Sequence, residues 1–206
     1  MILEVQSTKP AQRVIDQAIA VFQRGGLIVF PTDTGYAIGC DLFQKKSIDR
    51  IIQIKKRDSK KPLSFYCSDL KELYQFAIVS TPAYRAMRRL LPGPYTFVLP
   101  ATKLVPKLLV SRRSSVGIRI PANPVTLALV GSLRHPLIGT SCANPDGEPL
   151  TDAKSIQKAF GKNIDLILDA GPSASEPSTV IDFTTPEPMI IRKGKGQLSG
   201  FDLKGE

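Results

Sequence analysis

Short apolar runs bounded by glycine or proline alternate along this chain with segments of helical periodicity. The first run, Leu27–Phe30, follows the pair Gly25-Gly26 and precedes Pro31. A run this short and apolar is typical of a strand that is buried on both faces of a sheet. The residues before it carry apolar side chains three and four apart, which predicts a helix that ends near Arg24. A helix followed by a buried strand is typical of an α/β fold.

The same alternation continues along the rest of the chain. Capping side chains and prolines predict helix starts at Ser47, Ser68, Thr81, Asn123 and Thr151. Further strands are expected at residues 63–66, 95–99, 116–120, 137–138, 166–168, 180–183 and 189–191. The last strands follow one another without helices, so the sheet is expected to be mixed. We therefore predict an α/β sheet of at least seven strands with about six helices packed on it.

Length and composition suit one globular domain. The 206 residues are 42% hydrophobic and 22% charged, and they contain no repeat and no shift in composition. We therefore expect a single domain over residues 1–206, and the last dozen residues, rich in glycine and lysine, are expected to form a loose tail.

The charge balance restricts the partners. Lysine and arginine number 28 against 18 acidic residues, a net charge of +10 that favours nucleotides, RNA or other phosphate-rich ligands. The longest apolar stretch is too short to cross a membrane and the N-terminus lacks a signal pattern, so we expect a cytoplasmic protein without a membrane partner. Cys40, Cys67 and Cys142 are widely spaced, which predicts neither disulfides nor a metal site.

Three polar segments are candidates for chemistry. Residues 30–41 form a hydroxyl-rich segment after the first buried strand, and residues 136–149 follow another strand in the same way. Residues 55–61 carry five cations, enough to bind a triphosphate. Each segment has a structural alternative. Residues 30–41 could form a tight turn, residues 136–149 an Asx turn around Asn144, and residues 55–61 a charged helix end. Two separate cations complete the set: Arg192, and Arg119 within a strand, whose burial would require an anionic partner.

Several chemistries are disfavoured. The chain contains no phosphate-binding loop of the G-x-x-x-x-G-K-[ST] type, no G-x-G-x-x-G motif before a helix and no kinase signature. The Lys193–Gly196 segment is only a weak lookalike. His135 is the single histidine and has no evident partners, which disfavours acid–base catalysis by histidine.

Taken in order, these segments resemble the YrdC/YciO family. The resemblance covers about Pro10 to Gly196, and the segment Thr32–Ala37 is more similar to the YciO branch. The motifs that carry it are Gly25-Gly26, Pro31–Tyr36, Lys55-x-Arg57, Lys61-Pro62-Leu63, Pro92–Thr96, Leu99-Pro100-Ala101, Val116–Pro121, Gly139–Ser141 with Asn144, Ser178–Asp182 and Arg192-x-Gly194.

The resemblance implies a twisted open mixed sheet with surrounding helices and a basic concave cavity. It also implies synthesis of L-threonylcarbamoyl-adenylate and pyrophosphate from L-threonine, bicarbonate and ATP, for modification of the adenosine beside the tRNA anticodon. ATP would be a substrate, accompanied by Mg²⁺, with no tightly bound cofactor and no metal site on the protein. Some members are described as binding double-stranded RNA or tRNA.

Family roles transfer to matching positions of this chain. Lys55 and Arg57 would be catalytic, since their charges would stabilise the leaving pyrophosphate. Arg119 would pair with the carboxylate of threonine. The full set implied for ATP is Lys55, Arg57, Lys61, Ser115, Ser141, Asn144 and Arg192, and the set implied for threonine is Thr32, Thr34, Tyr36, Tyr66, Arg119 and Ser178.

Three positions depart from the family pattern. The Ser-x-Asn motif is one residue longer here, as Ser141–Asn144. Tyr66 stands where many active relatives have histidine, and Gly139 stands where a hydroxyl often faces threonine. Two alternatives therefore stand beside the synthase: a double-stranded RNA-binding or tRNA-binding protein with lost or redirected catalysis, and a nucleotide or anion sensor without turnover.

Overall fold

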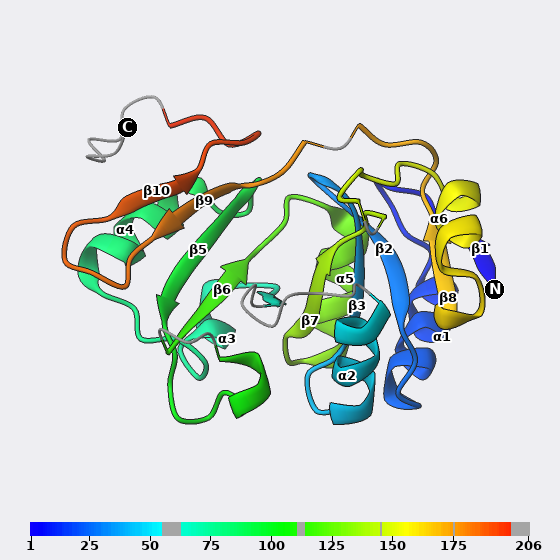
Figure 1. Ribbon diagram of the computed structural model, residues 1–206, viewed down its shortest axis with the longest axis horizontal. Helices are drawn as coiled ribbons and strands as arrows, with labels where there is room; N and C mark the ends of the chain where they lie inside the picture. Colours follow the sequence, from blue (N-terminus) through cyan, green and yellow to red (C-terminus); the bar gives the residue numbers. More distant parts are fainter. Residues whose placement is uncertain (55–62, 111–113, 145, 175, 199–206) are drawn as a thin grey trace.

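The computed structural model describes residues 1–54, 63–110, 114–144, 146–174 and 176–198. Within these ranges lie ten strands and six α-helices (Figure 1). The strands are β1 (Ile2–Glu4), β2 (Ile28–Thr32), β3 (Gly35–Asp41), β4 (Ser64–Tyr66), β5 (Tyr95–Pro100), β6 (Ser115–Arg119), β7 (Leu137–Ser141), β8 (Leu166–Asp169), β9 (Thr179–Asp182) and β10 (Met189–Arg192). The helices are α1 (Gln12–Gln23), α2 (Lys45–Ile54), α3 (Leu70–Leu73), α4 (Thr81–Leu90), α5 (Pro124–Leu133) and α6 (Ala153–Phe160).

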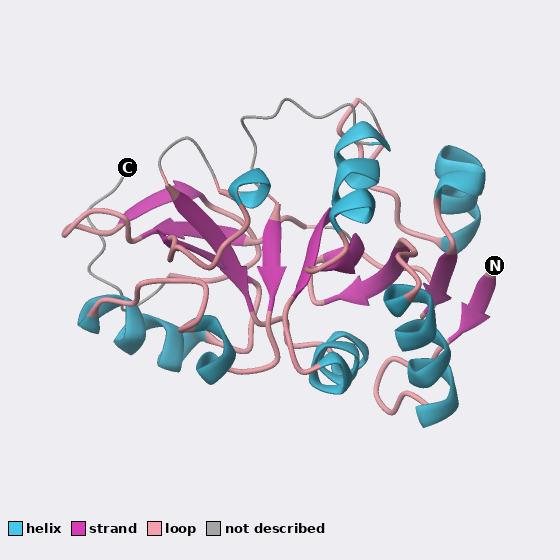
Figure 2. Ribbon diagram, turned by 90° about the horizontal axis from the view of Figure 1, so that it is seen from below, coloured by secondary structure: helices cyan, strands magenta, loops and turns pink. Residues whose placement is uncertain are grey.

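The ten strands form one open sheet in the order β1-β8-β2-β3-β7-β4-β6-β5-β9-β10. Four neighbouring pairs are parallel and five are antiparallel, which confirms the expected mixed α/β sheet. The strands turn strongly from one end of the sheet to the other, and helices lie on both sides of it (Figure 2). No helix in the described part of the chain is both long and apolar enough to span a bilayer.

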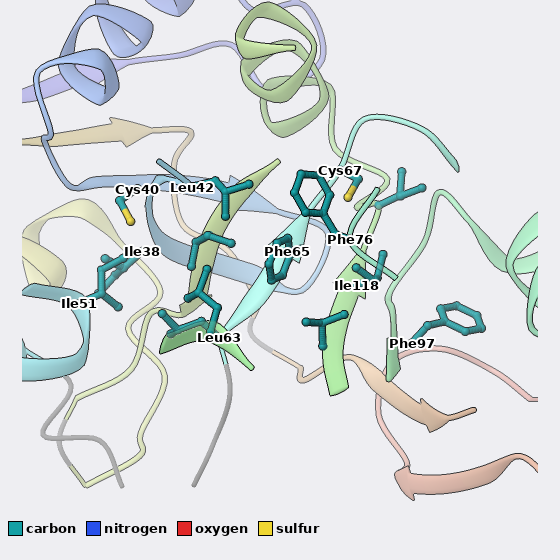
Figure 3. Close-up of a cluster of buried hydrophobic side chains, with 14 of the residues drawn as sticks. Ile38, Cys40, Leu42, Ile51, Leu63, Phe65, Cys67, Phe76, Phe97 and Ile118 are labelled. Carbon is teal, nitrogen blue, oxygen red and sulfur yellow. The ribbon is translucent and has the colours of Figure 1, made fainter. Parts of the chain in front are cut away.

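Helices bury two separate sets of apolar side chains against the sheet. α1 and α5 pack on β2 through residues such as Phe22 and Leu129, in a cluster that also contains Phe30. The second cluster is larger and takes side chains from α2, α4 and α6 (Figure 3). Its centre includes Phe65 and Ile118, neither of which is exposed to solvent. Burial on both faces explains why the central strands read as continuous apolar runs.

β3 occupies most of residues 30–41, the hydroxyl-rich segment for which no second strand was expected. The loop is only a tight turn between Thr32 and Gly35, and all seven residues of β3 are buried. Glycines and a final aspartate weaken the strand signal in the sequence. Gly39 is nevertheless required, because a Cβ there would lie 2.7 Å from the ring of Phe30 and 2.9 Å from the carbonyl oxygen of Ile138.

Helix starts were predicted well where a proline lies in the first turn of the helix. Asn123 caps α5 through its side chain, and α4 begins at Thr81 with Ser80 as its cap. The prediction that Ser47 caps a helix is wrong, because α2 begins two residues earlier and the Ser47 hydroxyl donates to the carbonyl of Gly25 at 2.7 Å. The caps of α3 and α6 are Asp69 and Asp152, each one residue after the predicted position.

Candidate functional site

The turn between β2 and β3 forms the centre of the candidate site. Thr32 ends β2, and its hydroxyl donates to the carbonyl of Gly35 at 2.6 Å. The same oxygen accepts the backbone N–H of Thr34 at 3.1 Å. Gly35 has φ of +105°, a conformation that favours glycine. The hydroxyls therefore hold the turn closed and place Asp33 and Thr34 at its tip.

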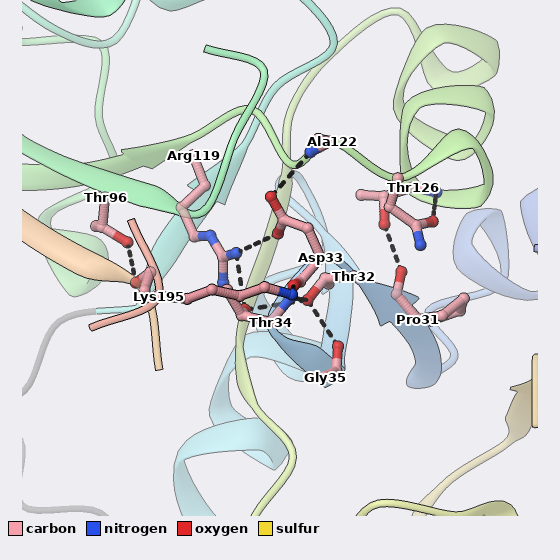
Figure 4. A network of polar contacts seen from close by, with 12 residues as sticks. Pro31, Thr32, Asp33, Thr34, Gly35, Thr96, Arg119, Ala122, Thr126 and Lys195 are labelled. Atoms are coloured by element: carbon pink, nitrogen blue, oxygen red, sulfur yellow. Dashed lines mark hydrogen bonds and ion pairs between the residues drawn. The ribbon is translucent and has the colours of Figure 1, made fainter. Parts of the chain in front are cut away.

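Arg119 reaches this tip from the end of β6 (Figure 4). Its Nη2 donates to Asp33 Oδ1 at 2.8 Å and to Thr34 Oγ1 at 2.9 Å. The second oxygen of Asp33 accepts the backbone N–H of Ala122 at 3.0 Å. The side chains of Arg119 and Asp33 are only 7% and 8% exposed, so this is a buried ion pair. Asp33 is thus the anionic partner that burial of Arg119 requires.

Arg119 retains donor capacity beyond this ion pair. Its guanidinium carbon lies 5.3 Å from the ring centroid of Tyr66, a cation–π contact. Its Nε is buried and has no hydrogen-bond acceptor among the described residues. A buried donor without an acceptor costs about 1–3 kcal/mol, so native proteins rarely leave one unpaired. Arg119 therefore keeps one buried donor without a described acceptor.

A second arginine lies beside the first. Arg192, at the end of β10, donates to the carbonyl of Ser178 through Nε at 3.0 Å and through Nη2 at 2.9 Å. Nη2 also lies 3.1 Å from Ser178 Oγ, which is 2.8 Å from the hydroxyl of Thr96. Burial lowers the pKa of Arg192, and the positive charge of Arg119 lowers it further. The positive charge of Arg119 thus acts on Arg192 in addition to burial.

A third cation comes from the segment after β10. Lys195 Nζ donates to the backbone carbonyl of Asp33 at 2.6 Å. The polar contacts at this turn thus combine Arg119 and Lys195 with one described carboxylate, Asp33, while Arg192 bonds to Ser178 nearby. No cluster of three potential metal ligands occurs among the residues that the structure describes. The arrangement is suited to an anionic organic ligand.

The structure brings together Thr32, Thr34, Tyr66, Arg119, Ser178 and Arg192 of the predicted set. Lys55, Arg57 and Lys61 lie outside the described residues. Ser115 lies at the opposite end of β6 from Arg119, about 13 Å away at the usual rise per residue.

The hydroxyl of Tyr36 points to a different part of the sheet. It donates to the carbonyl of Gly171 at 2.7 Å and accepts the N–H of Ala170 at 2.9 Å. Burial, with a smaller contribution from Asp169, raises the pKa of Tyr36 to about 12. The phenol therefore remains neutral at physiological pH and joins β3 to the end of β8.

His135 lies at the other end of β3 from the turn. Its Nε2 is 3.6 Å from a carboxylate oxygen of Asp41, the last residue of that strand. Its ring packs against Phe43 at 4.9 Å between centroids. Its third described contact is with the carbonyl of Pro136, so its described contacts lie away from the β2–β3 turn.

The long Ser141–Asn144 segment continues the β-ladder. The N–H of Cys142 donates to the carbonyl of Tyr36, and the N–H of Leu150 donates to the carbonyl of Cys142. Asn144 Oδ1 accepts the N–H of Glu148 at 2.8 Å. The Asn144 side chain therefore stabilises a turn, as the structural alternative anticipated, while Ser141 is exposed at the end of β7.

Two departures from the family pattern, Gly139 and Tyr66, lie close together. A Cβ at Gly139 would lie 3.1 Å from the ring of Tyr66 and 2.7 Å from the carbonyl oxygen of Ile38. Tyr66 pairs with Leu137 on the neighbouring strand and stacks under Arg119. A side chain at position 139 would thus meet the backbone of Ile38 and, less closely, the ring of Tyr66.

This packing predicts a coupled effect on stability. Gly139→Ala should lower the free energy of unfolding by about 1–3 kcal/mol through overpacking, measured by urea denaturation. Gly131→Ala is the matched control: it is a helical glycine with nothing within 4 Å of the added Cβ, so it should leave stability equal or higher. Adding Tyr66→His to Gly139→Ala should cost less than the sum of the single changes. Strict additivity would show that the two positions are independent.

Two site residues were not assigned from the sequence. Asp33 stands between two threonines that were assigned, and the expected anionic partner of Arg119 was the signal that could have identified it. Lys195 was placed in a loose tail, and no sequence pattern indicates its contact with Asp33.

Comparison with known proteins identifies the family. The family model Sua5_yciO_yrdC, described as "Telomere recombination", matches residues 20–194. The uncharacterized protein YciO of Escherichia coli is 38% identical over 199 residues, which cover 96% of this chain and 97% of YciO. The crystal structure of E. coli YciO superposes with a TM-score of 0.92 at 36% identity, covering 97% of this chain and 98% of that one.

Relatives with a named activity or ligand are more distant than these. A threonylcarbamoyl-AMP synthase of Coxiella burnetii is 34% identical over 179 residues, covering 84% of this chain and 94% of the synthase. The crystal structure of P. abyssi Sua5 complexed with L-threonine superposes with a TM-score of 0.87 at 29% identity, covering 94% of this chain but 57% of Sua5. The chain belongs to the Sua5/YciO/YrdC family and is more similar to YciO than to these relatives.

Proposed function

We propose that this protein is a threonylcarbamoyl-adenylate synthase, which forms this product and pyrophosphate from L-threonine, bicarbonate and ATP for tRNA modification. The observation that carries the proposal is the buried guanidinium of Arg119, whose Nε has no acceptor among the described residues and which lies near two further cations. A substrate carboxylate would satisfy that donor. The named synthase of C. burnetii and the threonine complex of P. abyssi Sua5 support the choice of amino acid.

The reaction needs positioning and positive charge more than proton transfer by a side chain. The amine of threonine combines with bicarbonate, with loss of water, to give a carbamate. A carbamate oxygen then bonds to the α-phosphorus of ATP, and the bond from that phosphorus to pyrophosphate breaks. Arg119 would hold the carboxylate, and the hydroxyls of Thr32 and Thr34 would border the amino acid. Pre-placed charges stabilise such a step without reorganisation.

The nucleotide would be bound by the other predicted residues. Lys55, Arg57 and Lys61 would contact the phosphates and stabilise the departing pyrophosphate. Arg192, Ser115, Ser141 and Asn144 complete the nucleotide set that the family pattern implies. The described residues offer no group of three metal ligands, so we assign no Mg²⁺ ligand to the chain.

The test is release of pyrophosphate by the purified protein. With ATP, Mg²⁺, bicarbonate and L-threonine all present we expect release, and omission of threonine or of bicarbonate should each abolish it. Release that continues without threonine would indicate simple hydrolysis of ATP. No release from the complete mixture, with ATP still bound, would favour a binding protein.

The net charge of +10 favours RNA binding as a second candidate function. Binding of double-stranded RNA or tRNA would depend steeply on salt, because each neutralised duplex phosphate adds about 0.9 to the log–log slope.

A further inference from the structure

The residues after β10 form a fixed segment, which we call the C-terminal strap (Lys193–Leu198). The N–H of Lys195 donates to the carbonyl of Pro177 at 2.9 Å. Thr179 Oγ1 accepts the N–H of Gly194 at 3.0 Å and donates to the carbonyl of Gly196 at 2.7 Å. Lys195 and Gly196, at the start of the expected loose tail, therefore form hydrogen bonds with the fold.

Two glycines let the strap approach the sheet closely. A Cβ at Gly194 would collide with the carbonyl oxygen of Pro177, and a Cβ at Gly196 would collide with the ring of Tyr95. The phenol of Tyr95 also donates to the carbonyl of Gln197 at 2.7 Å. The residue between the two glycines is consequently held in a defined position.

That residue, Lys195, extends toward the turn at Asp33 and Thr34, beside the guanidinium of Arg119 (Figure 4). Its Nζ bonds to the backbone carbonyl of Asp33, 162 positions earlier in the chain. An ammonium has three donors, so this bond leaves two of them. A carbonyl carries no charge, so the charge of Lys195 is also left without a counter-ion in this contact.

The carboxylate of Asp33 already has a partner for each of its two oxygens. One of its oxygens accepts from Arg119 and the other from the N–H of Ala122. Lys195 contacts the main chain of the same residue instead of this carboxylate. Lys195 is therefore a second cation near Arg119. The single negative charge of Asp33 is paired with Arg119, so Asp33 has none left for Lys195.

We propose that Lys195 is a specificity-determining residue that binds the carboxylate of the amino-acid substrate together with Arg119. The proposal rests on the function proposed above and extends it to a residue that the family pattern does not assign. The strap thereby makes the site selective for a free carboxylate, as opposed to an amide or ester of the same amino acid.

The test compares the binding of L-threonine and L-threoninamide by calorimetry, because the two ligands share the ammonium and hydroxyl groups and differ in the carboxylate. In Lys195→Met we expect affinity for L-threonine to fall about tenfold, the size of one charge-assisted hydrogen bond. Affinity for L-threoninamide should change by less than about twofold. Lys193→Met, an exposed lysine on the same strap, is the matched control and should bind both ligands as the unmodified protein does.

The other outcomes overturn the proposal in distinguishable ways. An equal loss for both ligands would give Lys195 a structural role only. Unchanged threonine binding in Lys195→Met, with pyrophosphate release intact in the unmodified protein, would overturn this inference and leave the proposed function standing. Failure of the unmodified protein to bind L-threonine would overturn both.

Discussion

Replacing Arg119 with alanine is expected to abolish pyrophosphate release and to lower the free energy of unfolding by about 3–5 kcal/mol. The carboxylate of Asp33 is 8% exposed and would keep only the N–H of Ala122 as a described partner. Tyr66 would also lose the cation above its ring. The pyrophosphate assay measures the loss of activity, and urea denaturation measures the loss of stability.

A double variant separates the two roles of Arg119. Asp33→Asn with Arg119→Met removes both charges while keeping side chains of similar length, so no buried charge is left unpaired. Stability should return to within about 1–2 kcal/mol of the unmodified protein, since buried ion pairs are often replaceable by neutral groups. Activity should remain absent, because nothing then binds the carboxylate of threonine.

Two results would contradict this account. If Arg119→Ala unfolds at the same urea concentration as the unmodified protein, the ion pair with Asp33 contributes little to stability. If the double variant releases pyrophosphate normally, Arg119 does not bind the substrate.

The fold was predictable wherever a single periodic signal was strong. The buried strand before Pro31 and the helix after Asn123 both follow from local patterns, and both are present. β3 was missed because Gly35 and Gly39 weaken its local signal, while its place in the sheet depends on Phe30 and Ile138 from other strands. β1 was missed as well, since its three residues pair only with β8, more than 160 positions later.

The sequence predicted several residues of the candidate site, but it did not predict which of them contact one another. Thr32, Thr34 and Arg119 were expected together, and they are joined by hydrogen bonds at one turn. Tyr36 lies only two residues from Thr34, yet its hydroxyl bonds to the residues that follow β8, because Thr34 belongs to the turn and Tyr36 to β3. The contact of Lys195 depends on the path of a segment after the last strand, for which the sequence carries no periodic signal.

Replacing Lys55 or Arg57 with alanine is expected to reduce pyrophosphate release by about 100-fold or more each, the usual cost of removing one group that stabilises developing charge. Both positions lie between the end of α2 at Ile54 and the start of β4 at Ser64. If they bind the triphosphate, affinity for ATP should also fall. Thermal denaturation should be nearly unchanged, which would exclude loss of the fold as the cause.

Lys45→Ala provides the control that decides between the two candidate functions. Lys45 is an exposed residue in the first turn of α2, so its removal changes the net charge by the same amount as Lys55→Ala. In a synthase, Lys45→Ala keeps its pyrophosphate release and Lys55→Ala does not. In an RNA-binding protein, removal of a lysine that contacts a phosphate lowers the salt slope by about 0.9, and pyrophosphate release is absent from every variant. Full release by both Lys55→Ala and Arg57→Ala would contradict the synthase assignment, because the leaving pyrophosphate would then need no charge from this segment.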